Sequence, residues 1–86
     1  MITKKKVEIA VKSKLGYLVE YYSKKYSFTT EQSYCYIRDT GIVDILKSGD
    51  NRLFLESVEL IIDAIDIFYS QGKEQMYTYL KDNIGG

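Results

Sequence analysis

Residues 52–69, RLFLESVELIIDAIDIFY, decide the fold that we expect for this chain. Their apolar side chains recur every three or four positions, which is the spacing of one face of an α-helix. Further apolar residues widen that face and leave one polar stripe on the other side. The apolar set is Phe54, Leu55, Val58, Leu60, Ile61, Ile62, Ala64, Ile65, Ile67, Phe68 and Tyr69, and the polar set, called the acidic stripe below, is Glu56, Glu59, Asp63 and Asp66. Because a helix that is apolar around most of its circumference is buried, we predict the central helix of a bundle, with Asp50 or Asn51 as its N-cap.

Outward from this segment, helical patterns cover residues 4–25, 30–39, 42–47 and 73–83. Apolar residues in the first of these step by three or four along one face: Val7, Val11, Leu15, Leu18 and Tyr22. Thr3 is its expected N-cap, and Gly16 within it indicates either the close approach of another helix or a tolerated weak point.

Turn signals separate the segments. Residues 29–32, Thr-Thr-Glu-Gln, fit a capping box at the start of the second helix, and Gly41 suits its end. Residues 70–72, Ser-Gln-Gly, break the pattern before the last helix. With no proline in the chain, we predict an all-α protein: a single domain over residues 1–86 that forms a compact bundle of about five helices.

The composition argues against catalysis. The 86 residues include no histidine, so the commonest general base and metal ligand is missing. A single cysteine, Cys35, excludes an internal disulfide or a cysteine-rich zinc site, and we expect it to fill space in the core. We therefore expect a protein that is not an enzyme and has no cofactor and no metal. No apolar run approaches the roughly 20 residues of a membrane span or forms a signal peptide, which predicts a cytoplasmic location.

The net charge of zero conceals an uneven distribution of charge along the chain. Residues 1–25 contain seven lysines against two glutamates, whereas residues 44–66 contain six acidic residues against two basic ones. Two packed elements could simply carry complementary solvated faces, or one face could bind a partner of opposite sign.

We predict that the acidic face binds a protein partner with a basic surface, such as a toxin or a defence enzyme. The expected contacts are the acidic stripe together with Tyr69 and Gln71 just after it, because tyrosine rings bury much area at low entropic cost. The predicted function is thus a small non-enzymatic module that neutralises another protein, in the manner of an antitoxin or immunity protein. Homodimer formation through the broad apolar helix stays open.

Two alternatives remain. The same size and charge suit a phage-type inhibitor of a bacterial defence nuclease. The basic first helix could instead bind nucleic acid, with its tyrosines stacking on bases and with phosphate contacts from Lys12, Lys14, Lys24 and Lys25.

Four stretches resemble a small bacterial family, domain-of-unknown-function family 3791. They are residues 18–25 (LVEYYSKK), 28–34 (FTTEQSY), 40–46 (TGIVDIL) and 66–74 (DIFYSQGKE). They are similar to the family's IEEY helix, LSGEEVY capping segment, GVIDYL helix and LHTQG turn. This chain departs from the family in having Tyr69-Ser70 in place of His-Thr and a longer segment 47–65. The resemblance implies an all-α protein, often encoded beside an ADP-ribosyltransferase-like protein, which is the layout of an antitoxin and its toxin.

Overall fold

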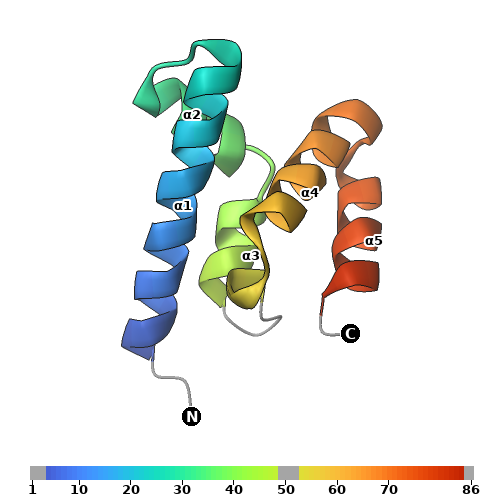
Figure 1. Cartoon of the computed structure of the whole chain (residues 1–86). Coiled ribbons are helices and arrows are strands. Elements are labelled where there is room, and N and C mark those ends of the chain that lie inside the picture. The colour runs from blue at the N-terminus through green and yellow to red at the C-terminus, as the bar shows by residue number, and fades with distance from the viewer. Residues whose placement is uncertain (1–3, 49–52, 85–86) are drawn as a thin grey trace.

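The computed structural model describes residues 4–48 and 53–84, and those residues form helices joined by short turns, with no strand among them. The elements are α1 (Lys4–Tyr26), α2 (Thr30–Arg38), α3 (Ile42–Ser48), the 3-10 helix η1 (Leu53–Leu55), α4 (Val58–Gln71) and α5 (Lys73–Asn83). The predicted all-α class and the predicted five helices are confirmed. Figure 1 shows α4 in the middle of the bundle, between α1 and α3 on one side and α5 on the other.

The long helix α1 lies against α2 through the face that the spacing predicted. Leu18 and Tyr22 are fully buried on this face, and Val11 nearly so. The hydroxyl groups of Ser23 on α1 and buried Ser33 on α2 share a hydrogen bond of 2.7 Å. Between the two helices Ser27 takes the left-handed conformation, with φ of 58°, and this reverses the chain direction. Thr3, the predicted cap of α1, lies outside the described residues.

Both ends of α2 are closed by side chains. The predicted capping box is present: the Gln32 amide donates to the Thr29 hydroxyl at 3.1 Å, and the Thr29 amide donates to the Gln32 side chain at 2.9 Å. After the helix, the buried Thr40 hydroxyl donates to the Ile37 carbonyl at 2.7 Å and accepts from the Ile42 amide at 3.1 Å. Thr40 therefore links the end of α2 to the start of α3.

The start of α4 differs from the prediction. We expected one helix over residues 52–69, but η1 ends at Leu55, the chain bends at Glu56, and α4 begins at Val58. The Ser57 hydroxyl is the N-cap and accepts a hydrogen bond from the Leu60 amide at 3.2 Å. Ser57 can satisfy the free amides of a helix start, and for that reason the helix restarts there. Asp50 and Asn51, the caps that we predicted, lie outside the described residues.

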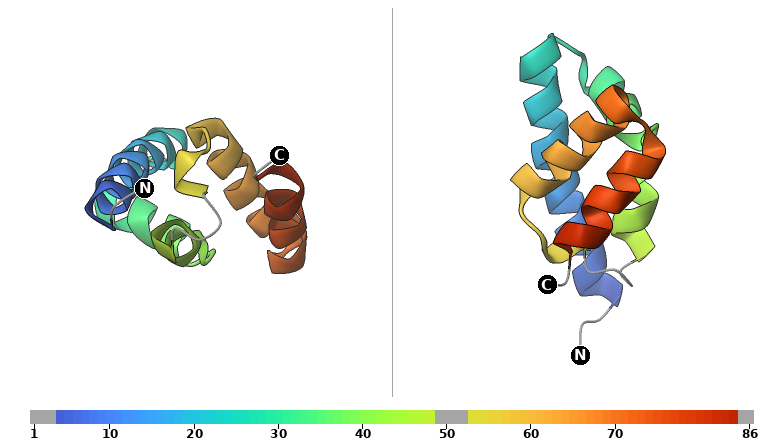
Figure 2. Two further views of the ribbon diagram at one scale, coloured as in Figure 1. Left: turned by 90° about the horizontal axis from the view of Figure 1, so that it is seen from below. Right: turned by 90° about the vertical axis from the view of Figure 1, so that its right-hand side faces the viewer.

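The helix α4 occupies the centre of the bundle, as predicted. Ile61, Ala64 and Ile65 are fully buried. Other apolar residues around its circumference are partly buried: Val58, Leu60, Ile62, Ile67 and Phe68. Figure 2 shows α1 and α5 on opposite sides of it.

The last helix, α5, runs back along α4 after a sharp turn at Gly72. This glycine has φ of 101° and ψ of 170°, a conformation that is open almost only to glycine. Met76 and Leu80 of α5 are buried, and α5 makes most of its contacts with α4. None of the described helices combines the length and the apolar character that crossing a membrane requires.

Candidate functional site

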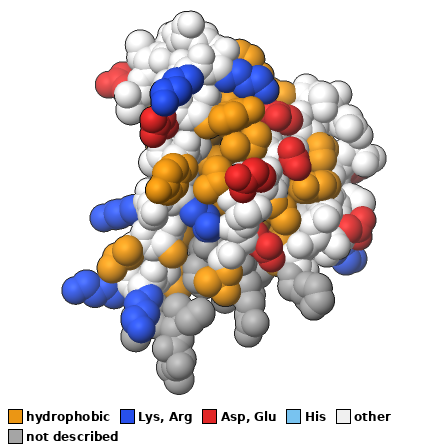
Figure 3. Space-filling model, in the orientation of Figure 1, with side chains coloured by type: hydrophobic (Ala, Val, Ile, Leu, Met, Phe, Trp, Pro, Cys, Tyr) orange, Lys and Arg blue, Asp and Glu red, His pale blue; other side chains and the backbone are white. Residues whose placement is uncertain are grey.

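Figure 3 shows acidic side chains on the same face as several lysine or arginine side chains, with apolar side chains among them. Glu59 and Asp63 are exposed on α4, and the Asp66 side chain is 39% exposed. Glu56 is partly buried in the bend that precedes the helix. The stripe thus has three members on one helix and a fourth just ahead of it.

Asp66 links α4 to α1 through two side-chain contacts. Its Oδ1 accepts a hydrogen bond of 3.0 Å from the hydroxyl of the buried Tyr22, which also lies 3.4 Å from the Ile62 carbonyl oxygen. Its Oδ2 lies 3.9 Å from the Lys25 Nζ. Burial and then the Asp66 carboxylate raise the pKa of Tyr22 far above its usual range, and the same carboxylate raises the pKa of Lys25. We call Tyr22, Lys25 and Asp66 the α1–α4 latch.

Asp63 makes a similar contact with α5. The Tyr79 hydroxyl of α5 donates to Asp63 Oδ2 at 3.3 Å, and burial followed by this carboxylate raises the pKa of Tyr79. The side chains of Glu56 and Glu59 make no such contact with the rest of the described chain. Two members of the acidic stripe therefore contact other helices, and the other two have no such contact within residues 4–48 and 53–84.

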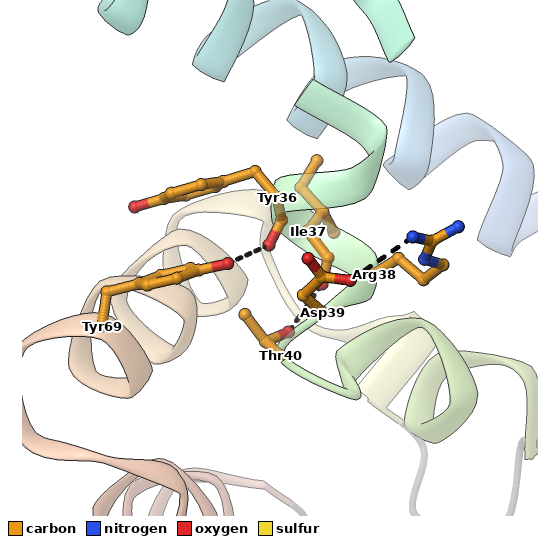
Figure 4. Close-up of polar contacts among 6 residues, drawn as sticks. All are labelled: Tyr36, Ile37, Arg38, Asp39, Thr40 and Tyr69. Atoms are coloured by element: carbon orange, nitrogen blue, oxygen red, sulfur yellow. Dashed lines mark hydrogen bonds and ion pairs between the residues drawn. The ribbon is translucent and has the colours of Figure 1, made fainter. Parts of the chain in front are cut away.

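Tyr69 and Gln71 lie at the far end of α4. The Tyr69 hydroxyl donates to the Tyr36 carbonyl oxygen at 2.7 Å, and the two rings stack with centroids 4.1 Å apart and planes 12° apart. Figure 4 shows the two rings lying one over the other between α2 and α4. Tyr69 still has 44% of its surface exposed, and Gln71 is exposed at the last position of the helix.

The Tyr69–Tyr36 stack belongs to a larger cluster of rings that sequence reasoning did not find. Neighbouring centroids in this aromatic cluster are 4.1 to 6.0 Å apart. Its members are Tyr21, Tyr22, Tyr26, Phe28, Tyr36, Phe68 and Tyr69. The high tyrosine content of residues 21–36 was the available signal, but we placed only Tyr22 on the buried face of the first helix and considered base stacking as an alternative role for the tyrosines of that helix. The contact with Tyr69 bridges 33 positions of sequence and leaves no local pattern.

A shallow groove of about 400 Å³ opens beside this cluster, along α2 and the end of α4. We call it the aromatic groove, and its lining consists of Phe28, Glu31, Gln32, Cys35, Tyr36, Asp39 and Tyr69. Cys35 is only partly buried, so it lines this groove rather than filling the core as we expected.

The four lysines proposed for nucleic-acid binding are spread around α1. Lys12 and Lys14, two positions apart, point about 200° apart around the helix axis. Lys12 lines a groove of about 580 Å³ together with Lys47 of α3, whereas Lys25 belongs to the α1–α4 latch. Lys24 pairs with Glu20 at 2.9 Å. The structure does not bring these four cations onto one face.

No three histidine, cysteine or acidic side chains of residues 4–48 and 53–84 come together in a way that could hold a metal ion. No family model matches the chain, and neither a curated protein nor a solved structure was found to be similar to it.

Proposed function

We propose that this protein is a small non-enzymatic module that binds a partner protein with a basic surface and neutralises it, in the manner of an antitoxin or an immunity protein. The observation that carries the proposal is that part of the acidic stripe is exposed to solvent and lies among tyrosine side chains. Glu59 and Asp63 are exposed, and tyrosines from α1 and α5 lie against the neighbouring carboxylates. Carboxylates beside aromatic rings suit a basic protein surface, because the charges orient the partner and the rings supply apolar area.

The contacts of the four carboxylates support a binding role for Glu56 and Glu59. Glu56 and Glu59 have no side-chain partner within the described chain, whereas Asp63 and Asp66 accept hydrogen bonds from tyrosines. A partner can therefore pair with the first two carboxylates without breaking a side-chain contact between described residues. The resemblance to domain-of-unknown-function family 3791 implies the same kind of role.

The test is to capture basic proteins from an extract of the native host on the tagged protein and to measure the affinity of each purified candidate by calorimetry. Reversing the two free charges, E56K/E59K, is expected to weaken binding about tenfold or more, since each exposed charge pair contributes up to about 1 kcal/mol. The helical circular dichroism spectrum should not change, because neither side chain contacts another helix among the described residues.

The matched control is D44K/D82K, which reverses two exposed carboxylates on α3 and α5, outside the acidic stripe. Both double variants change the net charge equally, and each alters one acidic residue in the first turn of a helix. The proposal fails if no basic protein binds the wild type, or if E56K/E59K binds the captured partner as tightly as D44K/D82K does.

A further inference from the structure

One wall of the aromatic groove, formed by Tyr36 and Tyr69, is held in place by contacts within the protein. The Tyr69 ring is held by its stacking on Tyr36 and by the 2.7 Å hydrogen bond to the Tyr36 carbonyl oxygen. On the other side, the Phe28 ring centroid lies 5.6 Å from that of Tyr36. A side chain that enters the groove meets aromatic surface that has already lost its rotamer freedom, which lowers the entropic cost of binding.

The two charged side chains in the lining are both carboxylates. Glu31 lies in the first turn of α2 and Asp39 caps its end, and both are exposed. Eight positions on a helix place them about 12 Å apart along its axis. Arg38 approaches Asp39 to 3.5 Å, but in Figure 4 its side chain extends away from the stacked rings. The charge of Asp39 also acts on Tyr69, whose pKa is raised first by burial and second by this carboxylate.

We propose that the aromatic groove binds a basic segment of the partner protein, with one arginine stacked against the Tyr69 ring and paired with Asp39, and a second arginine paired with Glu31. The proposal rests on the function proposed above and adds a second contact region to the acidic stripe. Arginine fits because its planar guanidinium group both stacks on aromatic rings and pairs with carboxylates. In an extended segment, two arginines three positions apart have Cα atoms about 10 Å apart, which matches the separation of the two carboxylates.

The test uses a defined peptide, acetyl-Gly-Arg-Gly-Gly-Arg-Gly-amide, titrated into the ¹⁵N-labelled protein and followed by NMR. We expect the shifted amides to lie in residues 28–40 and around Tyr69. The same peptide with citrulline, a neutral isostere, in both arginine positions should bind at least about fivefold more weakly, because each exposed charge pair contributes a few tenths to 1 kcal/mol. The only cysteine of the chain gives a second measurement: the bound peptide should slow the reaction of Cys35 with a thiol reagent.

Variants separate this groove from general electrostatic attraction. E31Q/D39N should weaken peptide binding about fivefold or more, whereas E20Q/D82N, which removes two exposed carboxylates outside the groove, should change it less than about twofold. Equal binding of the arginine and citrulline peptides, equal effects of the two double variants, or shifts centred on residues 56–66 would each overturn the proposal.

The two proposals can fail separately. The peptide test leaves Glu56 and Glu59 unchanged and needs no partner protein. If the peptide does not bind but E56K/E59K loses partner binding, only the proposal for the aromatic groove is rejected. Peptide binding in the groove without any partner from the host removes only the proposed neutralising function.

Discussion

Tyr22 shows how much one side chain contributes to this small protein. Its ring is fully buried and contacts the rings of Tyr21, Tyr26 and Tyr36, and its hydroxyl reaches the Asp66 carboxylate on α4. Burial and the neighbouring carboxylate both disfavour the tyrosinate form. The pKa is therefore raised, as it also is for Tyr36, Tyr69 and Tyr79, in each case chiefly by burial.

These shifts predict a loss of stability in alkali. A tyrosine whose pKa is higher in the folded state contributes its full stabilisation below the ordinary value of 10.0. Above that value the unfolded chain loses its proton first, so the free energy of unfolding should fall steadily as the pH rises. Urea unfolding followed by circular dichroism between about pH 9 and about pH 11 measures this fall.

Tyr22→Phe assigns the effect to the α1–α4 latch. The variant should be about 1 kcal/mol less stable at neutral pH, because it loses a partly buried hydrogen bond, and it should lose less stability than the wild type on going to alkaline pH. Tyr17→Phe is the control, since Tyr17 is largely exposed on α1 and has no hydrogen-bond partner among the described residues. Parallel pH curves for the wild type and Tyr22→Phe would contradict this explanation.

At the scale of elements, we expect alanine substitutions at two glycines to change the stability of the protein in opposite directions. Gly16 is exposed inside α1, and no atom of a neighbouring element lies within 4 Å of the position that a Cβ would take, so it is a tolerated weak point rather than a close approach. Gly16→Ala should stabilise the protein by about 0.5–1 kcal/mol. Gly72→Ala should destabilise it by about 1–3 kcal/mol, because at φ of 101° a Cβ is strained whatever space surrounds it. Thermal unfolding of both variants checks the two signs, and a stabilised Gly72→Ala would refute the account of the α4–α5 turn.

The helices were largely predictable from local sequence patterns, except for the start of α4. The apolar spacing, the Thr29 capping box and the glycines at 41 and 72 marked α1, α2, α3 and α5 closely. The start of α4 was missed because Phe54, Leu55 and Val58 continue the apolar spacing across the break. Helical periodicity cannot distinguish one continuous helix from a 3-10 helix followed by a new helix in nearly the same phase. Ser57 was the only local sign, and a serine within a helical pattern is common enough to be overlooked.

For the whole molecule, α5 is the helix that is supported mainly from one side. It packs mainly on α4, with Met76 and Leu80 as its buried side chains, while α1 contacts α2, α3, η1 and α4. A helix supported on one side opens locally at lower free energy than the core does. Leu80→Ala should therefore speed amide exchange in α5 strongly and leave the slowest amides of α1 much less affected.

Leu18→Ala provides the comparison, since Leu18 is fully buried on α1. It should lower protection throughout the described helices, at a cost of about 2–5 kcal/mol. Equal exchange profiles for the two variants, measured by NMR or mass spectrometry, would show that α5 opens only together with the rest of the molecule.

The candidate site was less predictable than the helices. The spacing placed Glu59, Asp63 and Asp66 on one face of a helix, which the structure bears out. No local pattern could show that Tyr22 and Tyr79 donate to two of these carboxylates, because the partners are 44 and 16 positions away. The sequence left open whether the basic and acidic elements carry complementary faces or one of them binds a partner. Lys25 lies 3.9 Å from Asp66, so part of the uneven charge along the chain is neutralised within the molecule.

The α1–α4 latch also has a consequence for the order of events during folding. Tyr22 and Asp66 are 44 positions apart in the sequence. They therefore meet only after the chain segments that form α1 and α4 have come together. The capping box of α2 spans three positions and can form much earlier. With no tryptophan in the chain, the near-ultraviolet absorbance comes chiefly from tyrosine, and the transfer of Tyr22 into the interior shifts part of it. A stopped-flow refolding experiment can compare this absorbance change in the wild type and in Tyr22→Phe. The part that is missing in the variant reports when α1 packs against α4.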